Sequence, residues 1–197
     1  MTYYDAGETQ VFNSLWYPRI EHGDLPLLGI DLIQFRDRFL VVVDFQPLDE
    51  KKELTDLKKL WEEMPLVLRG RMSQRFYDED RFFSDHMLFG RFSSEEALED
   101  GLVDVGGELW VAVQKYVALH MEMVMEQKQA AGGIAKENRI FRNDDAPHVL
   151  ERQREYDIYS AERDPAHAMF VKMFGKEFAD GYVYDFLFSL SGGGDGV

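Results

Sequence analysis

The clearest strand pattern in this 197-residue chain is LLGIDLIQF at residues 27–35, followed by FLVVVDF at residues 39–45. Both runs are rich in β-branched and aromatic residues, and the polar link Arg36-Asp37-Arg38 between them is short enough for a hairpin. Because side chains alternate along a strand, Gly29 and Asp31 share one face. The two runs predict an antiparallel hairpin that carries an acid, Asp31, inside an apolar strand.

Further elements are predicted on both sides of this hairpin. A strand-forming run precedes it at residues 11–17, and another apolar run follows at 82–92. Helical patterns cover residues 51–63, 94–129, 148–159, 165–174 and 177–188, with Gly175 as a cap between the last two. Strands that come first and helices that follow predict the α+β class, with a central antiparallel sheet flanked by helices in a three-layer α/β/α sandwich.

Length and composition favour a single domain. A chain of 197 residues with 45% apolar residues can bury a substantial core. No internal repeat or linker interrupts it. Residues 1–190 are therefore predicted to form one domain, and the Gly-rich residues 191–197 a flexible tail.

Charge and residue usage exclude several classes of function. The net charge of −15 argues against a nucleic-acid-binding protein, because phosphate contacts need clustered cations. The absence of cysteine excludes disulfides, iron–sulfur clusters and a cysteine nucleophile, and the five histidines show no metal-ligand spacing. No apolar stretch reaches the roughly 18 residues of a membrane span, and the N-terminus has no signal-peptide pattern, so a soluble protein is expected.

Three polar residues are candidates for chemistry. An ionised carboxylate in the apolar run around Asp31 loses hydration, so Asp31 must be paired, hydrogen-bonded or kept protonated. A proton donor and a purely structural buried acid are both compatible with this position. Asn13 lies inside the first strand, where the alternative is a satisfied buried amide. Asp164 precedes Pro165, which is also the pattern of a helix N-cap.

Four blocks of the sequence, in this order, resemble the ferredoxin-dependent bilin reductases. They are VFNSLWYP at 11–18, LPLLGID at 25–31, VDFQPL at 43–48 and YDIYSAERDPAH at 156–167, and FGKE at 174–177 and DFLF at 185–188 fit as well. The resemblance covers almost the whole chain. Members of this family carry additional strands before the Asn13 strand, so the chain resembles an N-terminally short member.

The resemblance implies an activity and a role for each candidate residue. In this family an open-chain tetrapyrrole, biliverdin, lies between the sheet and the C-terminal helices. Reduced ferredoxin supplies electrons one at a time from outside, and no cofactor is bound. Asp31 matches the central catalytic aspartate, Asp164 matches a C-terminal aspartate that several members use, and Asn13 falls where the phycoerythrobilin-forming branch has asparagine. The resemblance thus implies that Asp31 delivers a proton and that Asp164 is either a second proton donor or a group that positions the bilin. Asn13 is expected to orient the ring lactams or Asp31.

Within the family, residues 159–167 are most similar to members that reduce the C15–C16 methine bridge of biliverdin IXα. The product, 15,16-dihydrobiliverdin, is a step in phycoerythrobilin biosynthesis. Members that perform a second reduction on the A ring share the same three residues, and a non-catalytic bilin-binding protein is a further alternative. Substrate contacts are expected from Asn13, Gly29 and Arg75.

The resemblance also implies partners and a location. An acidic ferredoxin is expected to dock on the basic residues Lys51, Lys58, Arg69 and Arg75, for which the alternative is an ordinary solvated surface. A monomer is expected, able to pass its product to the next bilin reductase of the pathway. Its expected location is the cyanobacterial cytoplasm or the plastid stroma.

Overall fold

The computed structural model describes residues 1–5, 7–19, 25–49, 53–65, 68–69, 81–93, 95–96, 107–133 and 146–192. The chain divides into two compact units, Met1–Arg139 and Ile140–Val197. The division falls between the helical patterns predicted over residues 94–129 and 148–159. The single domain over residues 1–190 stays a prediction.

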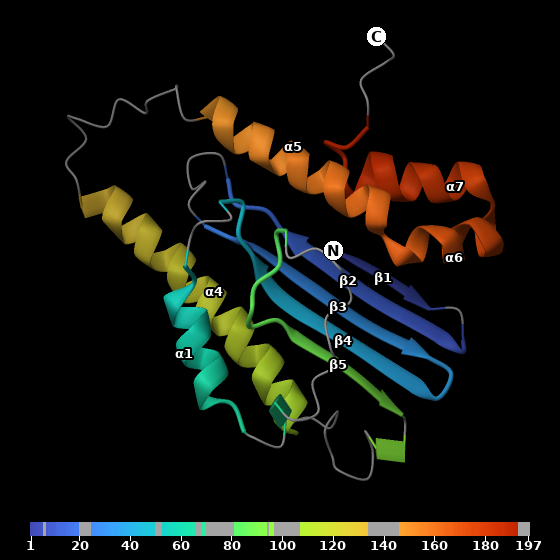
Figure 1. Ribbon diagram of the computed structural model, residues 1–197, viewed down its shortest axis with the longest axis horizontal. Coiled ribbons are helices and arrows are strands. Elements are labelled where there is room, and N and C mark those ends of the chain that lie inside the picture. The colour runs from blue at the N-terminus through green and yellow to red at the C-terminus, as the bar shows by residue number, and fades with distance from the viewer. Residues whose placement is uncertain are drawn as a thin grey trace. The chain divides into compact units, whose positions relative to one another are not determined.

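The first unit is built on a five-stranded antiparallel sheet in the order β1-β2-β3-β4-β5 (Figure 1). Its strands are β1 (Thr2–Asp5), β2 (Thr9–Trp16), β3 (Leu27–Phe35), β4 (Arg38–Gln46) and β5 (Leu88–Ser93). The predicted hairpin between β3 and β4 is confirmed. At its turn Arg36 has a left-handed φ of 53°, and its backbone N–H donates to the carbonyl of Glu8 over 2.7 Å.

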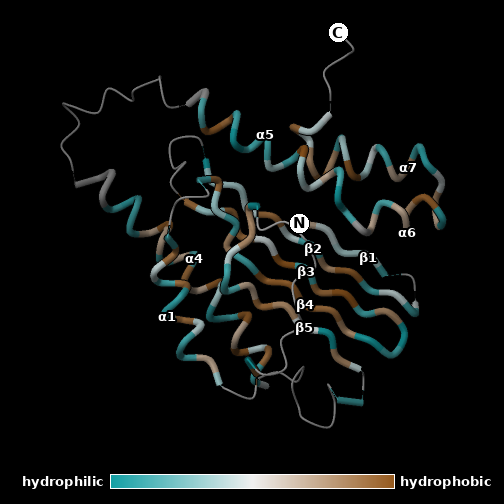
Figure 2. Tube along the Cα trace, viewed as in Figure 1, coloured by the Kyte–Doolittle hydropathy of each residue, from teal (hydrophilic) through white to brown (hydrophobic). Residues whose placement is uncertain are grey.

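The core of the first unit lies on one face of this sheet. Leu28 and Ile30 of β3 and Val43 of β4 point to that face, where the helices α1 (Thr55–Glu63) and α4 (Glu108–Gly133) supply Leu57 and Tyr116. Figure 2 shows the hydrophobic residues gathered along the central strands. Each fully buried aliphatic side chain of this kind stabilises the fold by about 1.5–3 kcal/mol. The opposite face of the sheet carries the odd-numbered residues of β3, Asp31 among them.

Two elements of the first unit differ from the sequence prediction. The strand predicted over 82–92 is present only as β5, because Phe82 adopts a left-handed φ of 64° and Ser84 is held by the side chain of Asp44. The short strand β1 was not predicted, since its pairing partner β2 rather than its own sequence stabilises it.

The two helices predicted for the first unit are confirmed in part. Residues 53–54 are not helical, so α1 begins later than its pattern suggested. Residues 95–96 are helical, as predicted, and α4 covers the predicted helix from Glu108 onward. Residues 51–52, 94 and 97–106 of the predicted helices lie outside the described residues.

The second unit consists of consecutive helices. They are α5 (Ala146–Arg163), α6 (Pro165–Phe174), α7 (Lys176–Asp180) and the π-helix η2 (Gly181–Leu187). Gly175 has a φ of 90° and separates α6 from α7, which confirms it as a cap. The helix predicted over 177–188 is instead a short α-helix that widens into η2. Asp157 of α5 accepts a hydrogen bond from the N–H of Leu190 over 2.9 Å and so ties down the end of η2.

The α+β class with a central antiparallel sheet is confirmed. Helices α1 and α4 form one helical layer against this sheet (Figure 1). The helices of the second unit make up the rest of the predicted helical content. Among the described residues, no helix is both long and apolar enough to cross a membrane.

Candidate active site

The sheet brings Asn13 and Asp31 together. In the register of β2 and β3 the two residues stand directly opposite each other. The amide nitrogen Nδ2 of Asn13 donates a short hydrogen bond to Oδ1 of Asp31, and both side chains are half-buried. Directly opposed residues of antiparallel strands have Cβ atoms about 4.5–5.5 Å apart, so this contact follows from the register. The acid and the amide singled out in the sequence form one pair.

The Asn13 contact makes the two oxygens of Asp31 unequal. An amide NH₂ group only donates, so Oδ1 must act as an acceptor toward it. A proton carried by the Asp31 carboxyl group is therefore directed to Oδ2. The neighbouring strands extend this row on the same face of the sheet, with Thr2 of β1 opposite Asn13 and Val42 of β4 opposite Asp31.

Gly29 lies two residues before Asp31 on the same face, and a side-chain amide occupies the space beside it. A Cβ atom built on Gly29 would stand 3.2 Å from Nε2 of Gln46. Gln46 itself is buried. The room that glycine provides is therefore filled at least partly by Gln46, which sequence reasoning missed. The sequence did contain a sign of this contact. Asp44 and Gln46 are two residues apart in β4, so they lie on the same face of the sheet as Gly29.

Asp44 is a second acid on this face, and its contacts are structural. The side chain is fully buried and accepts hydrogen bonds from the backbone N–H of Ser84, over 2.9 Å, and from the Ser84 hydroxyl. The hydroxyl of Tyr116 in turn donates to the carbonyl of His86. Asp44 thus anchors the segment that leads into β5.

Asp164 of the second unit caps α6. Its carboxylate accepts a hydrogen bond from the N–H of Ala166 over 2.7 Å, and Pro165 occupies the first helical position. The N-cap interpretation is confirmed. Burial raises the pKa of the Asp164 carboxyl above its ordinary value, although the Ala166 N–H and the charge of His167 act in the opposite direction. Asp164 is therefore both a structural cap and an acid that retains its proton to higher pH.

A polar cluster follows Asp164 in the second unit. Nε2 of His167 lies 2.9 Å from Oδ1 of Asp180, and the ammonium group of Lys176 binds the other oxygen of Asp180. The His167 ring also meets Tyr184 of η2 edge-on, with 5.7 Å between ring centroids. Sequence reasoning missed this cluster. Its signal was the place of His167, at the third position of the helix that Asp164 caps.

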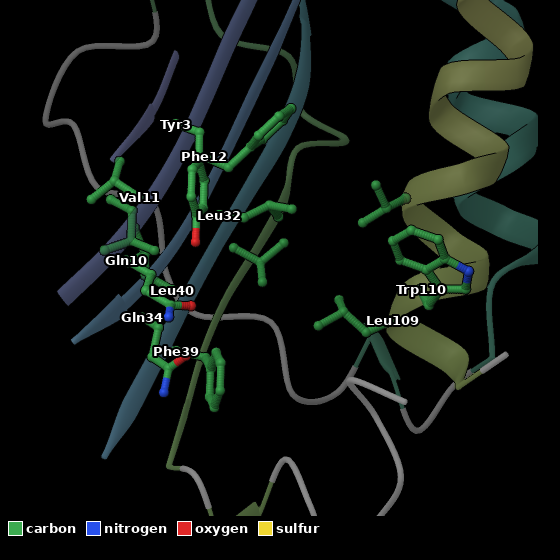
Figure 3. A pocket seen from close by; sticks show the side chains of 13 residues that line it. Tyr3, Gln10, Val11, Phe12, Leu32, Gln34, Phe39, Leu40, Leu109 and Trp110 are labelled. Carbon is green, nitrogen blue, oxygen red and sulfur yellow. The ribbon is translucent and has the colours of Figure 1, made fainter. Parts of the chain in front are cut away.

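The first unit also contains an apolar pocket, shown in Figure 3. It encloses about 270 Å³ between the sheet and the start of α4, and Phe12, Leu32, Phe39, Leu109 and Trp110 are among the residues that line it. Phe12 and Leu32 directly precede or follow Asn13 and Asp31 in sequence, so they point to the other face of the sheet. Pockets for drug-sized ligands usually measure about 300–1,000 Å³. This pocket is smaller and lies on the opposite face from the acid–amide pair.

The remaining predicted site residues are only partly described. Lys58 is exposed on α1 and Arg69 is half-buried, whereas Lys51 and Arg75 lie outside the described residues. No group of three or more His, Asp or Glu side chains that could hold a metal ion occurs in the described part of the chain.

Comparison with known proteins places these features in a family. Residues 1–189 match the family model described as ferredoxin-dependent bilin reductase. Two relatives are both named 15,16-dihydrobiliverdin:ferredoxin oxidoreductase. The one from Nostoc punctiforme is 36% identical over 95% of this chain and 71% of its own length. The one from Synechococcus sp. (strain WH7803) is 39% identical over 97% of this chain and 77% of its own length.

A solved structure matches the fold. Phytochromobilin synthase from tomato, crystallised in complex with biliverdin, superposes with a TM-score of 0.69 at 20% sequence identity. The match covers 94% of this chain and 62% of that protein, so this chain spans less than two thirds of its length.

Proposed function

The chain belongs to the ferredoxin-dependent bilin reductase family, and from this premise we propose that it reduces biliverdin IXα at the C15–C16 methine bridge to 15,16-dihydrobiliverdin. This makes it an oxidoreductase that acts on CH–CH groups, with ferredoxin as electron donor, in phycoerythrobilin biosynthesis. The observation that carries the proposal is the hydrogen-bonded pair of Asn13 and Asp31 within a chain that matches the family over residues 1–189.

The reaction balances as two electrons and two protons. Two reduced ferredoxins each give one electron and become oxidised, and the bridge double bond becomes a single bond with one new hydrogen on each carbon. The electrons come from outside the chain. The protein has to bind the pigment and deliver the protons.

Asp31 delivers the first proton in this proposal. Its Oδ1 is held by Asn13, so the transferable proton sits on Oδ2 in a fixed direction. The one-electron-reduced bilin is more basic than biliverdin and takes this proton. The amide of Asn13 then stabilises the carboxylate that remains, because hydrogen bonds to a charged group are stronger than those to a neutral one.

Asp164 delivers the second proton. Its raised pKa keeps it protonated to higher pH than an ordinary aspartate, which suits an acid that must hold a proton until the second electron arrives. Gly29 and Arg75 are proposed to contact the pigment.

The partners follow from the same proposal. Lys58, with Lys51, Arg69 and Arg75, forms a docking patch for an acidic ferredoxin, and charge reversal at Lys51 and Lys58 raises the KM for ferredoxin and weakens its dependence on salt. The protein acts as a monomer that passes its product to the next bilin reductase, in the cyanobacterial cytoplasm or the plastid stroma.

One anaerobic assay tests the activity. Biliverdin is incubated with the protein, ferredoxin and a ferredoxin-reducing system, and the products are separated by HPLC. The expected product has lost conjugation at one bridge, so its absorbance moves to shorter wavelength. Conversion that proceeds through a second reduction on the A ring would identify a phycoerythrobilin synthase instead.

A binding measurement separates catalysis from simple pigment binding. A spectral shift of biliverdin on mixing, followed by no further change when electrons are supplied, would identify a non-catalytic bilin-binding protein and refute the proposed activity.

A further inference from the structure

The second unit surrounds His167 with groups that orient its ring. Asp180, at the end of α7, binds Nε2 of His167 over 2.9 Å, and Lys176 at the start of α7 holds the other oxygen of Asp180. Tyr184 of η2 contacts the ring edge-on. Two contacts, from α7 and η2, therefore fix the imidazole, and Lys176 in turn fixes the carboxylate that binds it. A ring fixed by a carboxylate in this way is typical of a histidine that handles protons.

His167 also stands beside the acid that caps its helix. Asp164 is the N-cap of α6 and His167 the third helical residue, and side chains in a helix lean toward its N-terminus. This lean directs the His167 ring toward the first turn of α6, the turn that the Asp164 carboxylate caps. The charge of His167 acts on that carboxyl in the direction that lowers its pKa, while burial, the larger influence, raises it.

Exposure to solvent decreases along the cluster. The side chain of Lys176 is 77% exposed, that of Asp180 35% and that of His167 26%. Asp164 is half-buried, and burial is the main influence on its ionisation. An acid that has given up its proton in such a place needs a partner through which water can return one.

We propose that His167, oriented by Asp180, is a positioning residue that returns a proton to Asp164 after each turnover. The proposal rests on the proposed function, because it gives Asp164 a proton to lose. In this step an N–H bond of the imidazolium breaks and an O–H bond forms on Asp164. The neutral ring then takes a proton from water, and no electron moves. Since Asp180 occupies Nε2, the exchange with Asp164 runs through Nδ1.

Other charged groups near this pair come from each neighbouring element of the second unit. Arg163 and Glu162 at the end of α5 pair with each other over 3.2 Å, and the Arg163 guanidinium lies 4.2 Å from the Tyr159 ring centroid. Lys176 and Asp180 of α7 and Tyr184 of η2 complete the set. Of these groups, His167 both acts on Asp164 through its charge and contacts a second carboxylate, that of Asp180.

The test compares pH profiles of turnover in the full-length protein. Wild type, His167→Gln and Asp180→Asn are assayed with biliverdin and reduced ferredoxin from pH 5.5 to about 9, alongside His148→Gln, an exposed histidine on α5, as matched control. We expect His167→Gln to slow turnover by about 10- to 100-fold and to remove the alkaline decline of the wild-type rate. Asp180→Asn should slow turnover less than His167→Gln does, and His148→Gln should keep the wild-type pH profile.

Chemical rescue distinguishes proton return from a structural role. His167→Ala leaves space where the ring stood, so imidazole added to the assay should restore part of the rate in proportion to its protonated fraction. The affinity for biliverdin, read from the absorbance change on binding, should stay within a few-fold of wild type in every variant.

The outcomes separate the two proposals. If wild type converts biliverdin and Asp164→Asn is impaired, while the His167 variants keep the wild-type pH profile and gain nothing from imidazole, His167 has no part in proton return. The proposed function then stands. If wild type fails to convert biliverdin at all, the proposed function itself is wrong.

Discussion

The sheet and the helical unit hold their acids in different ways. Asp31 accepts a hydrogen bond from the side chain of Asn13, across two strands that the backbone ladder already fixes. Asp164 accepts its hydrogen bond from the N–H of Ala166 and so serves as the cap of α6. Removing the Asp31 carboxyl group should therefore abolish chemistry with little cost to the fold, whereas truncating the Asp164 side chain should impair both.

The largest effect is expected for Asp31→Asn. The variant keeps the shape and size of the side chain but has no acidic proton, so turnover of biliverdin should fall by about 100-fold or more. The thermal midpoint should change little, because the strand register does not depend on this side chain. Asp37→Asn, in the exposed turn of the same hairpin, is the matched control. Full activity in Asp31→Asn would remove Asp31 from the mechanism.

Two replacements of Asp164 separate its proposed chemical role from its role as a helix cap. Asparagine is as good an N-cap as aspartate, so Asp164→Asn should retain stability while turnover falls by about 10-fold or more. Asp164→Ala loses the proton and the cap together, and should also lose about 1 kcal/mol of unfolding free energy. Turnover and denaturant unfolding of both variants measure the two effects separately. Equal stability of the two variants would contradict the capping role.

Asn13→Ala removes the orienting amide and leaves the acid. A hydrogen bond to a charged group contributes about 1.5–3 kcal/mol, so loss of this contact should slow turnover by about 10- to 150-fold. Gln10→Ala changes a side chain of the same type that points to the other face of β2, and it should keep the wild-type rate. If both variants have the wild-type rate, the Asn13 contact does not orient Asp31.

The sequence predicted the sheet site better than the helical one. Alternation along strands placed Gly29 and Asp31 on one face, Asn13 was noticed as an amide inside the first strand, and the family resemblance gave it a role beside Asp31. Their contact itself depends on strand register, which pairing between distant residues determines. The cluster at His167 depends on how the chain turns at Gly175, where a φ of 90° directs α7 back along α6. Nothing in the local pattern specifies that direction, so the contact with Asp180 was not predicted.

Gly29→Ala tests how closely the sheet site is packed. The added Cβ would stand 3.2 Å from the Gln46 amide, which has to move. Overpacking of this kind costs about 1–3 kcal/mol of stability. In the background of Gln46→Ala the same change should cost less, because the obstructing amide is gone. Denaturant unfolding of the two single variants and the double variant gives this coupling, and additive losses would show that Gly29 and Gln46 do not press on each other.

The smallest effect concerns stability in acid, where two aspartates of the helical unit should act in opposite directions. Burial raises the pKa of Asp164, so the folded state holds a proton that the unfolded state releases as pH rises above its ordinary pKa of about 3.9. Stability from Asp164 is therefore highest in acid and declines until pH passes the raised pKa.

Asp180 shows the opposite behaviour. The hydrogen bond from Lys176, together with the one from His167, lowers the pKa of Asp180. Its stabilisation is therefore present above about pH 4 and is lost as pH falls through the lowered value. Thermal unfolding from pH 3 to about 7 measures both effects. As pH rises, the stability advantage of wild type over Asp180→Asn should grow, whereas the stability of wild type relative to Asp164→Asn should fall. Parallel trends in the two variants would mean that burial does not control the ionisation of Asp164.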